Sequence, residues 1–243
     1  MPSSSVPEPY MRPLLAGRRA ECRAFVQRRI AETGDAVGLY RDLLWPAMEQ
    51  VERLYRADRI NTASQAMATR INRSIADQLQ LALVPMAPNG KRIVMTCADG
   101  EPEELGAQMT ADLFEARGWD VYFLGGGVPN DEILHLIGQV RPDILLIYGT
   151  QPAGVPGVRR LTDLIRDVGS NPTMNVMVSG GVFNRADGLW KEVNADILVK
   201  TAAEAIPAAE AAKPRPPEVR TPGAPKKRRR RRRPALLAAA AAT

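Results

Sequence analysis

The chain has 243 residues, 45% of them hydrophobic, which is enough for one or two packed domains and excludes a short peptide or a purely disordered chain. No stretch approaches the roughly 20 apolar residues that span a bilayer, and the N-terminus lacks a basic-then-apolar signal pattern, so we expect a cytoplasmic protein. The net charge is +6, but the run Lys226–Arg233 supplies eight positive charges, which leaves −2 for the rest of the chain.

Helical apolar spacing dominates the first third of the chain. A first helix is predicted to end near Gly34, and a second covers about 36–57, with Pro46 either kinking it or opening a new turn. A third begins at Asn61, a residue type favoured at helix N-termini. Short loops between helices favour antiparallel packing, so a small bundle is expected. The predicted segments are a disordered N-terminus at 1–13, the bundle at 14–83 and a Pro/Gly linker at 84–90.

From residue 91 the pattern changes to short apolar runs that alternate with amphipathic helices. Such runs are typical of strands buried on both faces, and repeated strand–helix units predict an α/β domain with a doubly wound, parallel five-stranded sheet, flavodoxin- or Rossmann-like. Ligands bind such sheets at the carboxyl ends of the strands. The predicted strands are RIVMTCA, DVYFLG, DILLIYG, NVMVSG and ADILVKT, the helices lie near 102–117, 130–140, 157–168 and 184–193, and the domain spans 91–212.

The C-terminal segment 213–243 is rich in Pro and Ala and has no apolar periodicity, so we expect it to be disordered. Its eight adjacent cations, Lys226–Arg233, can bind the phosphates of DNA or RNA without sequence preference. They can equally attract an anionic membrane surface or an acidic protein, or serve only to keep the chain in solution.

The turn after the first predicted strand, CADGEPEELG, carries four carboxylates in six residues. A phosphate site would need glycines and free N–H groups there, so these acids argue against a nucleotide ligand. Two of them, Glu103 and Glu104, suit the positive end of the following helix, where each would contribute about 0.3–1 kcal/mol. A hard-cation site or an acid–base pair is the alternative, but no nucleophile lies nearby in the sequence. The acids are Asp99, Glu101, Glu103 and Glu104.

Glycines follow the second and fourth predicted strands, at 125–127 and at Gly180-Gly181. They do not form the GxGxxG pattern of dinucleotide sites, and they fit tight turns as well as backbone contact with a flat ligand. No basic side chain precedes Arg159 at the expected ligand-facing turns. A neutral, bulky ligand is therefore favoured over a phosphate-rich one.

The order of helical bundle, linker and five-stranded α/β domain, with the segment GAQMTADLFEARGWDVYFLGGGVPNDEI, resembles the cobalamin-binding modules. The resemblance covers about 14–212 and is closest to the modules of light-sensing, adenosylcobalamin-dependent regulators and of corrinoid methyltransferases. It implies that a cobalamin, or a related tetrapyrrole such as a bilin or haem, is held between the bundle and the strand ends.

The first turn departs from that family's pattern, which reads D-x-H-x-x-G or E-x-H-x-x-G. Glu101 and Gly106 match it, but Glu103 stands where the family has the histidine that binds cobalt from below. A carboxylate suits cobalt less well than an imidazole, so binding without a protein histidine is expected. The single histidine of the chain, His135, is predicted to face solvent from its helix.

The resemblance also assigns roles to the other strand ends. Tyr148 replaces the family's serine after the third strand, and its ring is expected to fill part of the channel for the cofactor's nucleotide tail. Thr150 can supply a hydroxyl instead, and Gly180-Gly181 match the family's paired glycines.

In the bundle, the family's tryptophan and Glu-His pair above the corrin ring fall on Tyr55, Gln65 and Ala66. Tyr55 can still cover a ring face, although it and Trp45 also suit ordinary core positions. Ala66 cannot ligate cobalt, so no light-formed bis-histidine adduct is expected.

We therefore predict a sensory or regulatory binding module, photoreceptor-like in fold, without chemistry of its own. No Ser-His-Asp or Cys-His set can be formed around one exposed histidine, and no residue cluster suits zinc. The role of a methyltransferase's corrinoid carrier is disfavoured, because it uses the missing lower ligand. The alternative is a cofactor-free protein that uses the same fold to bind protein or nucleic acid, and a homo-oligomer is left open.

Overall fold

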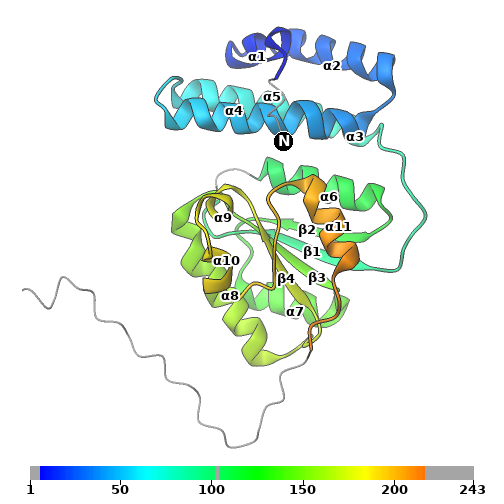
Figure 1. Ribbon diagram of the computed structural model, residues 1–243, viewed down its shortest axis with the longest axis vertical. Helices are drawn as coiled ribbons and strands as arrows, with labels where there is room; N and C mark the ends of the chain where they lie inside the picture. The colour runs from blue at the N-terminus through cyan, green and yellow to red at the C-terminus, as the bar shows by residue number, and fades with distance from the viewer. Residues whose placement is uncertain (1–5, 102–103, 217–243) are drawn as a thin grey trace, which may run out of the picture.

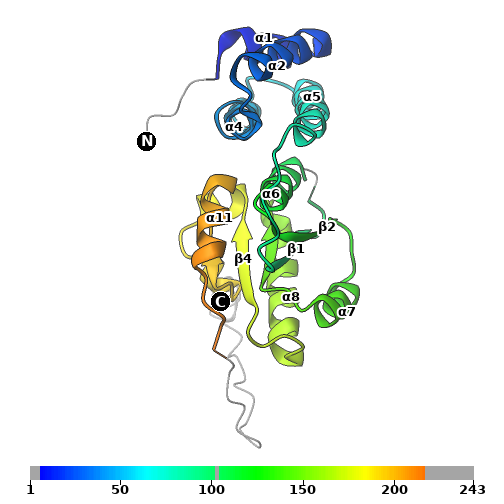
Figure 2. The ribbon, with the colours of Figure 1, turned by 90° about the vertical axis from the view of Figure 1, so that its right-hand side faces the viewer.

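A helical cap is stacked on an α/β domain in the computed structural model, which describes residues 6–101 and 104–216 (Figure 1). The view turned by 90° shows the cap helices above the α/β domain, joined to it by the extended segment after α5 (Figure 2). This arrangement confirms the predicted helical N-terminal part. The cap contains α1 (Glu8–Leu15), α2 (Arg19–Thr33), α3 (Ala36–Leu39), the π-helical turn η1 (Tyr40–Leu44), α4 (Trp45–Arg56) and α5 (Thr62–Gln80).

Helix α1 lies where the sequence analysis expected a disordered N-terminus, so that prediction is wrong from residue 8 onward. Proline is tolerated in the first helical turn, whose N–H groups have no partner within the helix, so Pro9 does not prevent α1 from forming. Tyr10 is fully buried, and its hydroxyl donates to Oδ1 of Asn72 in α5 at 2.7 Å. Packing against α5 therefore stabilises a helix that has little local signal.

The second predicted helix is present, but it contains the π-helical turn η1, which ends two residues before Pro46. The N–H of Trp45 donates to the carbonyl of Tyr40, five residues earlier. Because proline has no N–H and its ring crowds the preceding turn, the wider turn lets the helix continue through Pro46. The result is a helical run from α3 through α4 without a break.

Helix α5 begins as predicted after Asn61, whose Oδ1 accepts a hydrogen bond from the N–H of Ser64 at 2.9 Å. Ile71, Ile75 and Leu79 follow at intervals of four residues and are buried. The apolar spacing in the sequence thus identified the face of α5 that packs into the core.

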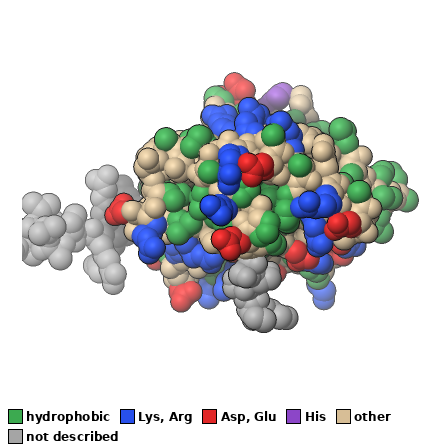
Figure 3. Space-filling model, turned by 90° about the horizontal axis from the view of Figure 1, so that it is seen from above, with side chains coloured by type: hydrophobic (Ala, Val, Ile, Leu, Met, Phe, Trp, Pro, Cys, Tyr) green, Lys and Arg blue, Asp and Glu red, His purple; other side chains and the backbone are tan. Residues whose placement is uncertain are grey.

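The outer surface of the cap carries basic, acidic and apolar side chains interspersed with one another (Figure 3). Arg18 and Glu21 form an ion pair at 3.3 Å, and Arg29 and Glu32 form another at 3.4 Å. About half of each side chain is exposed, and such surface pairs contribute about 0–1 kcal/mol each. The stability of the cap therefore comes mainly from burial.

The α/β domain contains a five-stranded parallel sheet with the order β2-β1-β3-β4-β5, which confirms the predicted doubly wound fold. All residues of β3 and β4 are buried, as expected for apolar strands with helices on both faces. The strands are β1 (Arg92–Cys97), β2 (Asp120–Gly125), β3 (Ile144–Tyr148), β4 (Asn175–Ser179) and β5 (Ile197–Leu198).

Successive residues of the strands belong to two separate core layers. Ile93 and Met95 pack on the side of α6 and α11, whereas Val94 packs on the side of α7 and α8. The first of these layers continues into the cap, so the cap and one face of the sheet share a hydrophobic core. The helices of this domain are α6 (Leu105–Ala116), α7 (Asn130–Val140), η2 (Pro152–Gly154), α8 (Val155–Val168), α9 (Gly181–Arg185), α10 (Leu189–Glu192) and α11 (Ala202–Ala211).

Three helices of this domain differ from the sequence prediction. The first begins at Leu105 rather than near 102, and the one expected at 184–193 is divided into α9 and α10. Gly188, with φ of 81°, separates these two short helices, because a left-handed residue cannot continue a right-handed helix. Helix α11 was not predicted; its alanine-rich sequence has a weak apolar stripe, and it forms by packing on α6.

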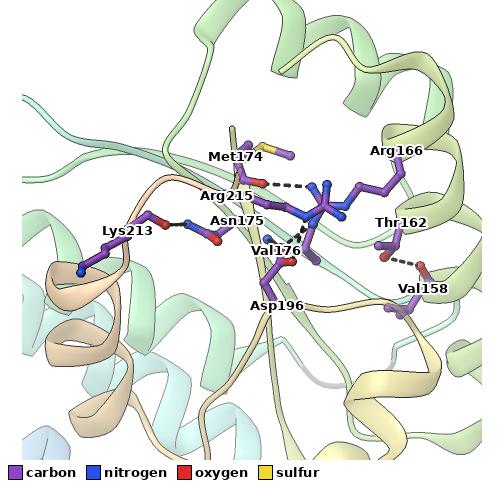
Figure 4. A network of polar contacts seen from close by, with 9 residues as sticks. All are labelled: Val158, Thr162, Arg166, Met174, Asn175, Val176, Asp196, Lys213 and Arg215. Carbon is purple, nitrogen blue, oxygen red and sulfur yellow. Dashed lines mark hydrogen bonds and ion pairs between the residues drawn. The ribbon is translucent and has the colours of Figure 1, made fainter. Parts of the chain in front are cut away.

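The chain beyond α11 is fastened to the amino ends of the strands (Figure 4). Nδ2 of Asn175, the first residue of β4, donates to the carbonyl of Lys213 at 2.9 Å, and Nε of Arg215 lies 3.2 Å from the Asp196 carboxylate. The described structure thus continues past residue 212, where the sequence analysis ended the domain. The rest of the expected tail, from residue 217 on, lies outside the described residues.

Candidate functional site

A cavity of about 590 Å³ lies between the cap and the carboxyl ends of the strands. Helices α4 and α5 form its ceiling, and the turns after β1, β3 and β4 form its floor. Doubly wound sheets bind ligands at this edge, and the volume lies within the range of about 300–1,000 Å³ that is typical of ligand pockets. From the predicted site residues, the lining includes Tyr55, Gln65, Glu101, Tyr148, Thr150, Gly180 and Gly181.

Gly106, another predicted site residue, lies beside the floor at the start of α6 and contacts Tyr148. A Cβ on Gly106 would lie 2.2 Å from the hydroxyl oxygen of Tyr148, so only glycine fits there without displacing the ring. Tyr148 is 5% exposed. Its ring therefore fills the space between the start of α6 and the end of β3. Glu103, the remaining predicted site residue, lies outside the described residues.

Glu101 connects the turn after β1 to the turn after β3. Its carboxylate accepts hydrogen bonds from the backbone N–H of Thr150, at 2.5 Å, and from the Thr150 hydroxyl. From the other side, Nη2 of Arg185 in α9 donates to the carbonyl of Thr150 at 2.7 Å. Three neighbouring turns of the floor are thus held together by direct hydrogen bonds.

Two other acids of the same loop bind different neighbours. Oε1 of Glu104 accepts a hydrogen bond from the N–H of Gly126 at 2.7 Å, and a Cβ on Gly126 would lie 2.9 Å from that oxygen. Asp99 pairs with Arg160 of α8 at 3.6 Å. Glu104 directly precedes α6 but makes no side-chain cap for it. The acidic loop therefore ties the end of β1 to the end of β2, to the turn after β3 and to α8, in addition to any effect on the helix dipole.

The ceiling is held in place by side-chain hydrogen bonds along α4 and α5. Nε1 of Trp45 donates to Glu49 at 3.1 Å, and Nε2 of Gln65 donates to Glu52 at 3.2 Å. The hydroxyl of Tyr55 lies 3.4 Å from Oγ1 of Thr62. Trp45 and Tyr55, both of which suit ordinary core positions by sequence, line the cavity, and Tyr55 is available there as a ring cover.

Several lining residues were missed by the sequence analysis. Helical spacing could have found Met48, Glu49 and Glu52, which lie on the same face of α4 as Trp45 and Tyr55. No local pattern points to Asn184 and Arg185, which reach the cavity only because α9 follows Gly180-Gly181 at the end of β4.

Arg185 connects the charges of the floor with those of the ceiling. Burial lowers the pKa of its guanidinium below the ordinary value, and the positive charge of Arg56 on α4 lowers it further. Glu52 of the ceiling and Glu101 of the floor act in the opposite direction. Charges of both signs thus face one another across one side of the cavity.

His135 is exposed on α7, as predicted, with its Nε2 at 2.9 Å from Nε2 of Gln139. Among the residues that the structure describes, no cluster of three or more His, Cys, Asp or Glu side chains could hold a metal ion. In the same part of the chain, no helix is long and apolar enough to cross a membrane.

Comparisons with known proteins agree with this architecture. A family model described as the B12 binding domain matches residues 91–210, and a second model of the same description matches residues 8–80. A solved structure of the monomethylamine corrinoid protein of Methanosarcina barkeri has a TM-score of 0.75 at 17% sequence identity, over 84% of this chain and 96% of that chain. At this identity the likeness shows the fold.

Curated relatives include dimethylamine corrinoid protein 3 of Methanosarcina mazei, 23% identical over 151 residues, which cover 59% of this chain and 83% of that protein. Dimethylamine corrinoid protein 1 of Methanosarcina acetivorans is matched over 61% of its length. The HTH-type transcriptional repressor CarA of Myxococcus xanthus is 30% identical over 89 residues, 37% of this chain and 31% of that protein. The predicted closeness to light-sensing regulators stays a prediction.

Proposed function

Because this chain belongs to the B12-binding domain family, we propose that it holds a cobalamin-type corrinoid between the cap and the α/β domain and acts as a sensory or regulatory module. The observation that carries the proposal is the cavity, which lies at the carboxyl ends of the strands beneath α4 and α5. The names of the relatives, dimethylamine and monomethylamine corrinoid proteins, support a corrinoid as the ligand.

The lining of the cavity suits a flat macrocycle. Trp45 and Met48 give the ceiling an apolar surface, and the rings of Trp45 and Tyr55 suit contact with a ring face. Gly180 and Gly181 add no side chains of their own to the floor after β4, and the guanidinium of Arg185 lies over Gly181. A corrinoid bound there would supply a cobalt centre that can carry an alkyl group or change its oxidation state.

No imidazole of this chain is placed to ligate cobalt in the cavity. The sequence contains one histidine, His135, which is exposed on α7, and α7 contributes no residue to the cavity lining among the described residues. A bound corrinoid would therefore keep its own benzimidazole base on the metal. The absence of an imidazole ligand favours a sensory or regulatory role over that of a methyl carrier.

The closed floor supports the same binding mode. The contact between Tyr148 and Gly106, and the hydrogen bonds between Glu101 and Thr150, occupy the space between the turns after β1 and β3. A nucleotide tail that left the metal and extended toward the sheet would need this space. A corrinoid with its base on the metal does not require it.

Titration of the purified protein with hydroxocobalamin is expected to shift the cobalamin absorbance spectrum. After reduction to Co(II), electron paramagnetic resonance is expected to show nitrogen splitting from the ligand's own base. Cobinamide, which lacks that base, should bind without nitrogen splitting, and splitting in its spectrum would contradict the absence of a protein nitrogen ligand. Size-exclusion chromatography of the loaded protein, in the dark and after illumination, tests the sensory role. This role predicts that the elution volume changes when the ligand binds or when the complex is illuminated.

Gly181→Trp is expected to abolish the spectral shift, because a Cβ on Gly181 already approaches Nη1 of Arg185 at 2.5 Å and the indole would enter the cavity. Gly138→Trp is the matched control, since Gly138 is exposed on α7 and nothing lies within 4 Å of its Cβ position. If only haem or biliverdin gives a spectral shift, the ligand of the cavity is another tetrapyrrole and not a corrinoid. No shift with any of these ligands would favour the cofactor-free interaction protein.

A second candidate function is polyanion binding by the C-terminal tail, whose basic run Lys226–Arg233 lies outside the described residues. Lys213 and Arg215, among the last described residues before this run, are anchored at the amino ends of the strands (Figure 4), whereas the cavity lies at their carboxyl ends.

Deletion of residues 217–243 is expected to abolish binding of duplex DNA at low salt. If most of the eight cations contact phosphates, the affinity of the full chain should fall by about a thousandfold or more between 50 and 200 mM salt. A chain with Lys226–Arg233 replaced by alternating Gly and Ser keeps the tail length and should behave like the deletion. Unchanged DNA affinity in either chain would rule out the tail as the binding element.

A further inference from the structure

A buried carboxyl group connects the cap to the α/β domain away from the residues that line the cavity. Asp112 of α6 is 5% exposed, and its Oδ2 lies 2.9 Å from the hydroxyl oxygen of Tyr40 in η1. The same hydroxyl lies 2.8 Å from the carbonyl oxygen of Ala76 in α5. One tyrosine thus joins α6, which follows the floor loop, to α5, which carries part of the ceiling.

The hydroxyl of Tyr40 has two acceptors within hydrogen-bond distance but only one proton to donate. Burial raises the pKa of Tyr40 far above its ordinary value, so the hydroxyl keeps its proton near neutral pH. If Asp112 is ionised, Tyr40 can donate to Asp112 or to Ala76, and the other oxygen loses that hydrogen bond. If Asp112 is protonated, it donates to Tyr40 while Tyr40 donates to Ala76, so both short distances are hydrogen bonds.

The charges that surround Asp112 also favour the protonated form. Burial raises the pKa of Asp112 to about 6 against the opposing effect of the Tyr40 hydrogen bond, and the negative charges of Glu115 on α6 and Asp77 on α5 add to the increase. Within the described part of the chain, no basic side chain forms an ion pair with Asp112, and no hydrogen bond or ion pair joins it to α11.

We propose that Asp112 is a proton-dependent latch between the cap and the α/β domain: in its protonated form it holds α5 against α6 through Tyr40, and loss of the proton weakens the contact between these two helices. An open form would expose Asp112 to water and return its pKa to the ordinary range. The closed form therefore binds this proton more tightly, so it is favoured at acidic pH and loses this advantage as the pH rises through about 6.

Native-state hydrogen exchange of α5 and α6, measured by mass spectrometry between pH 5 and pH 8 and corrected for the intrinsic exchange rates, tests the latch. The opening equilibrium at this interface is expected to increase about tenfold over that pH range, given a pKa near 6 in the closed form and near 4 in the open one. Asp112→Asn should abolish this increase, because its uncharged amide can donate to Tyr40 at every pH. An opening equilibrium that is independent of pH in the unmodified protein, or an increase that persists in Asp112→Asn, would overturn the proposal.

Asp77→Asn is the matched control, because Asp77 is an exposed acid at the same interface, where its Oδ1 accepts a hydrogen bond from Gln108 at 2.6 Å. The opening equilibrium of Asp77→Asn should still increase with pH, with its midpoint at a lower pH. If the increase is lost in this variant, the pH dependence arises from the charge of the interface in general and not from Asp112. If Asp112→Asn does not fold, infrared spectroscopy of the unmodified protein decides. A protonated-carboxyl band that titrates near pH 6 is expected, and the absence of such a band at pH 5 would refute the latch.

Discussion

Gly180→Ala is expected to lower the free energy of unfolding by about 4 kcal/mol, from two costs that act together. Gly180 has φ of 102° and ψ of 164°, a backbone conformation that is essentially restricted to glycine. A Cβ at this position would also lie 2.2 Å from the carbonyl oxygen of Gly149, a backbone atom that cannot move away without displacing the turn after β3. Chemical denaturation with urea measures the change.

Gly169→Ala is the control for this prediction. Gly169 also has a positive φ, of 68°, but nothing lies within 4 Å of its Cβ position, so only the cost of the left-handed conformation remains, about 1 kcal/mol. Equal losses in the two variants would show that the close approach to Gly149 contributes nothing. Because Gly180 lies in the cavity floor, Gly180→Ala should also lower the affinity of the cavity for a ligand. Gly169→Ala should leave this affinity unchanged.

Asp196→Ala is expected to destabilise the protein by about 3 kcal/mol, at the lower end of the range for breaking a buried ion pair. The carboxylate pairs with Arg166 and Arg215 and accepts a hydrogen bond from the N–H of Val176 at 2.7 Å (Figure 4). The side chains of Asp196 and Arg215 are each 22% exposed, and that of Arg166 is 11% exposed. Removal of the Asp196 carboxylate therefore takes an ion-pair partner from two largely buried guanidinium groups. Thermal and urea denaturation measure the loss.

Asp163→Ala is the matched control for the Asp196 network. Asp163 also accepts hydrogen bonds from an arginine and an asparagine, Arg159 at 2.6 Å and Asn194 at 2.5 Å, but its side chain is 43% exposed. Exposed pairs contribute about 0–1 kcal/mol, so this variant should remain close to the unmodified protein. A loss in Asp196→Ala that is no larger than in Asp163→Ala would mean that the network does not stabilise the C-terminal anchor.

The order and type of most elements in the α/β domain could be predicted, because each strand is an apolar run whose composition already implies helices on both faces. The predicted helix at 130–140 has the observed bounds of α7, and the five predicted strands are all present. Helices α1 and α11 could not be predicted in this way. An interior proline, Pro13 in α1 and Pro207 in α11, weakens the local helix signal, and packing of α1 on α5 and of α11 on α6 stabilises these helices instead.

The candidate site could be predicted only as a location. The rule that ligands bind at the carboxyl ends of parallel strands pointed to the turns that carry Glu101, Thr150 and Gly180, and these turns line the cavity. The partner of each acid could not be read from the sequence. Glu101 is hydrogen-bonded to Thr150, 49 residues later in the chain, and Glu104 to Gly126, 22 residues later. The strand order brings these residues together, because it places β3 and β2 on either side of β1.

By itself, the sequence determined the layers of the protein and the edge of the sheet at which a ligand would bind, since apolar periodicity reports which face of an element is buried. Only the tertiary structure decided what the polar groups do: the acidic loop closes the cavity floor, and Tyr40 joins Ala76 to a buried Asp112. Hydrogen bonds and pKa values depend on which side chains meet and how much water remains between them, and local sequence patterns contain neither.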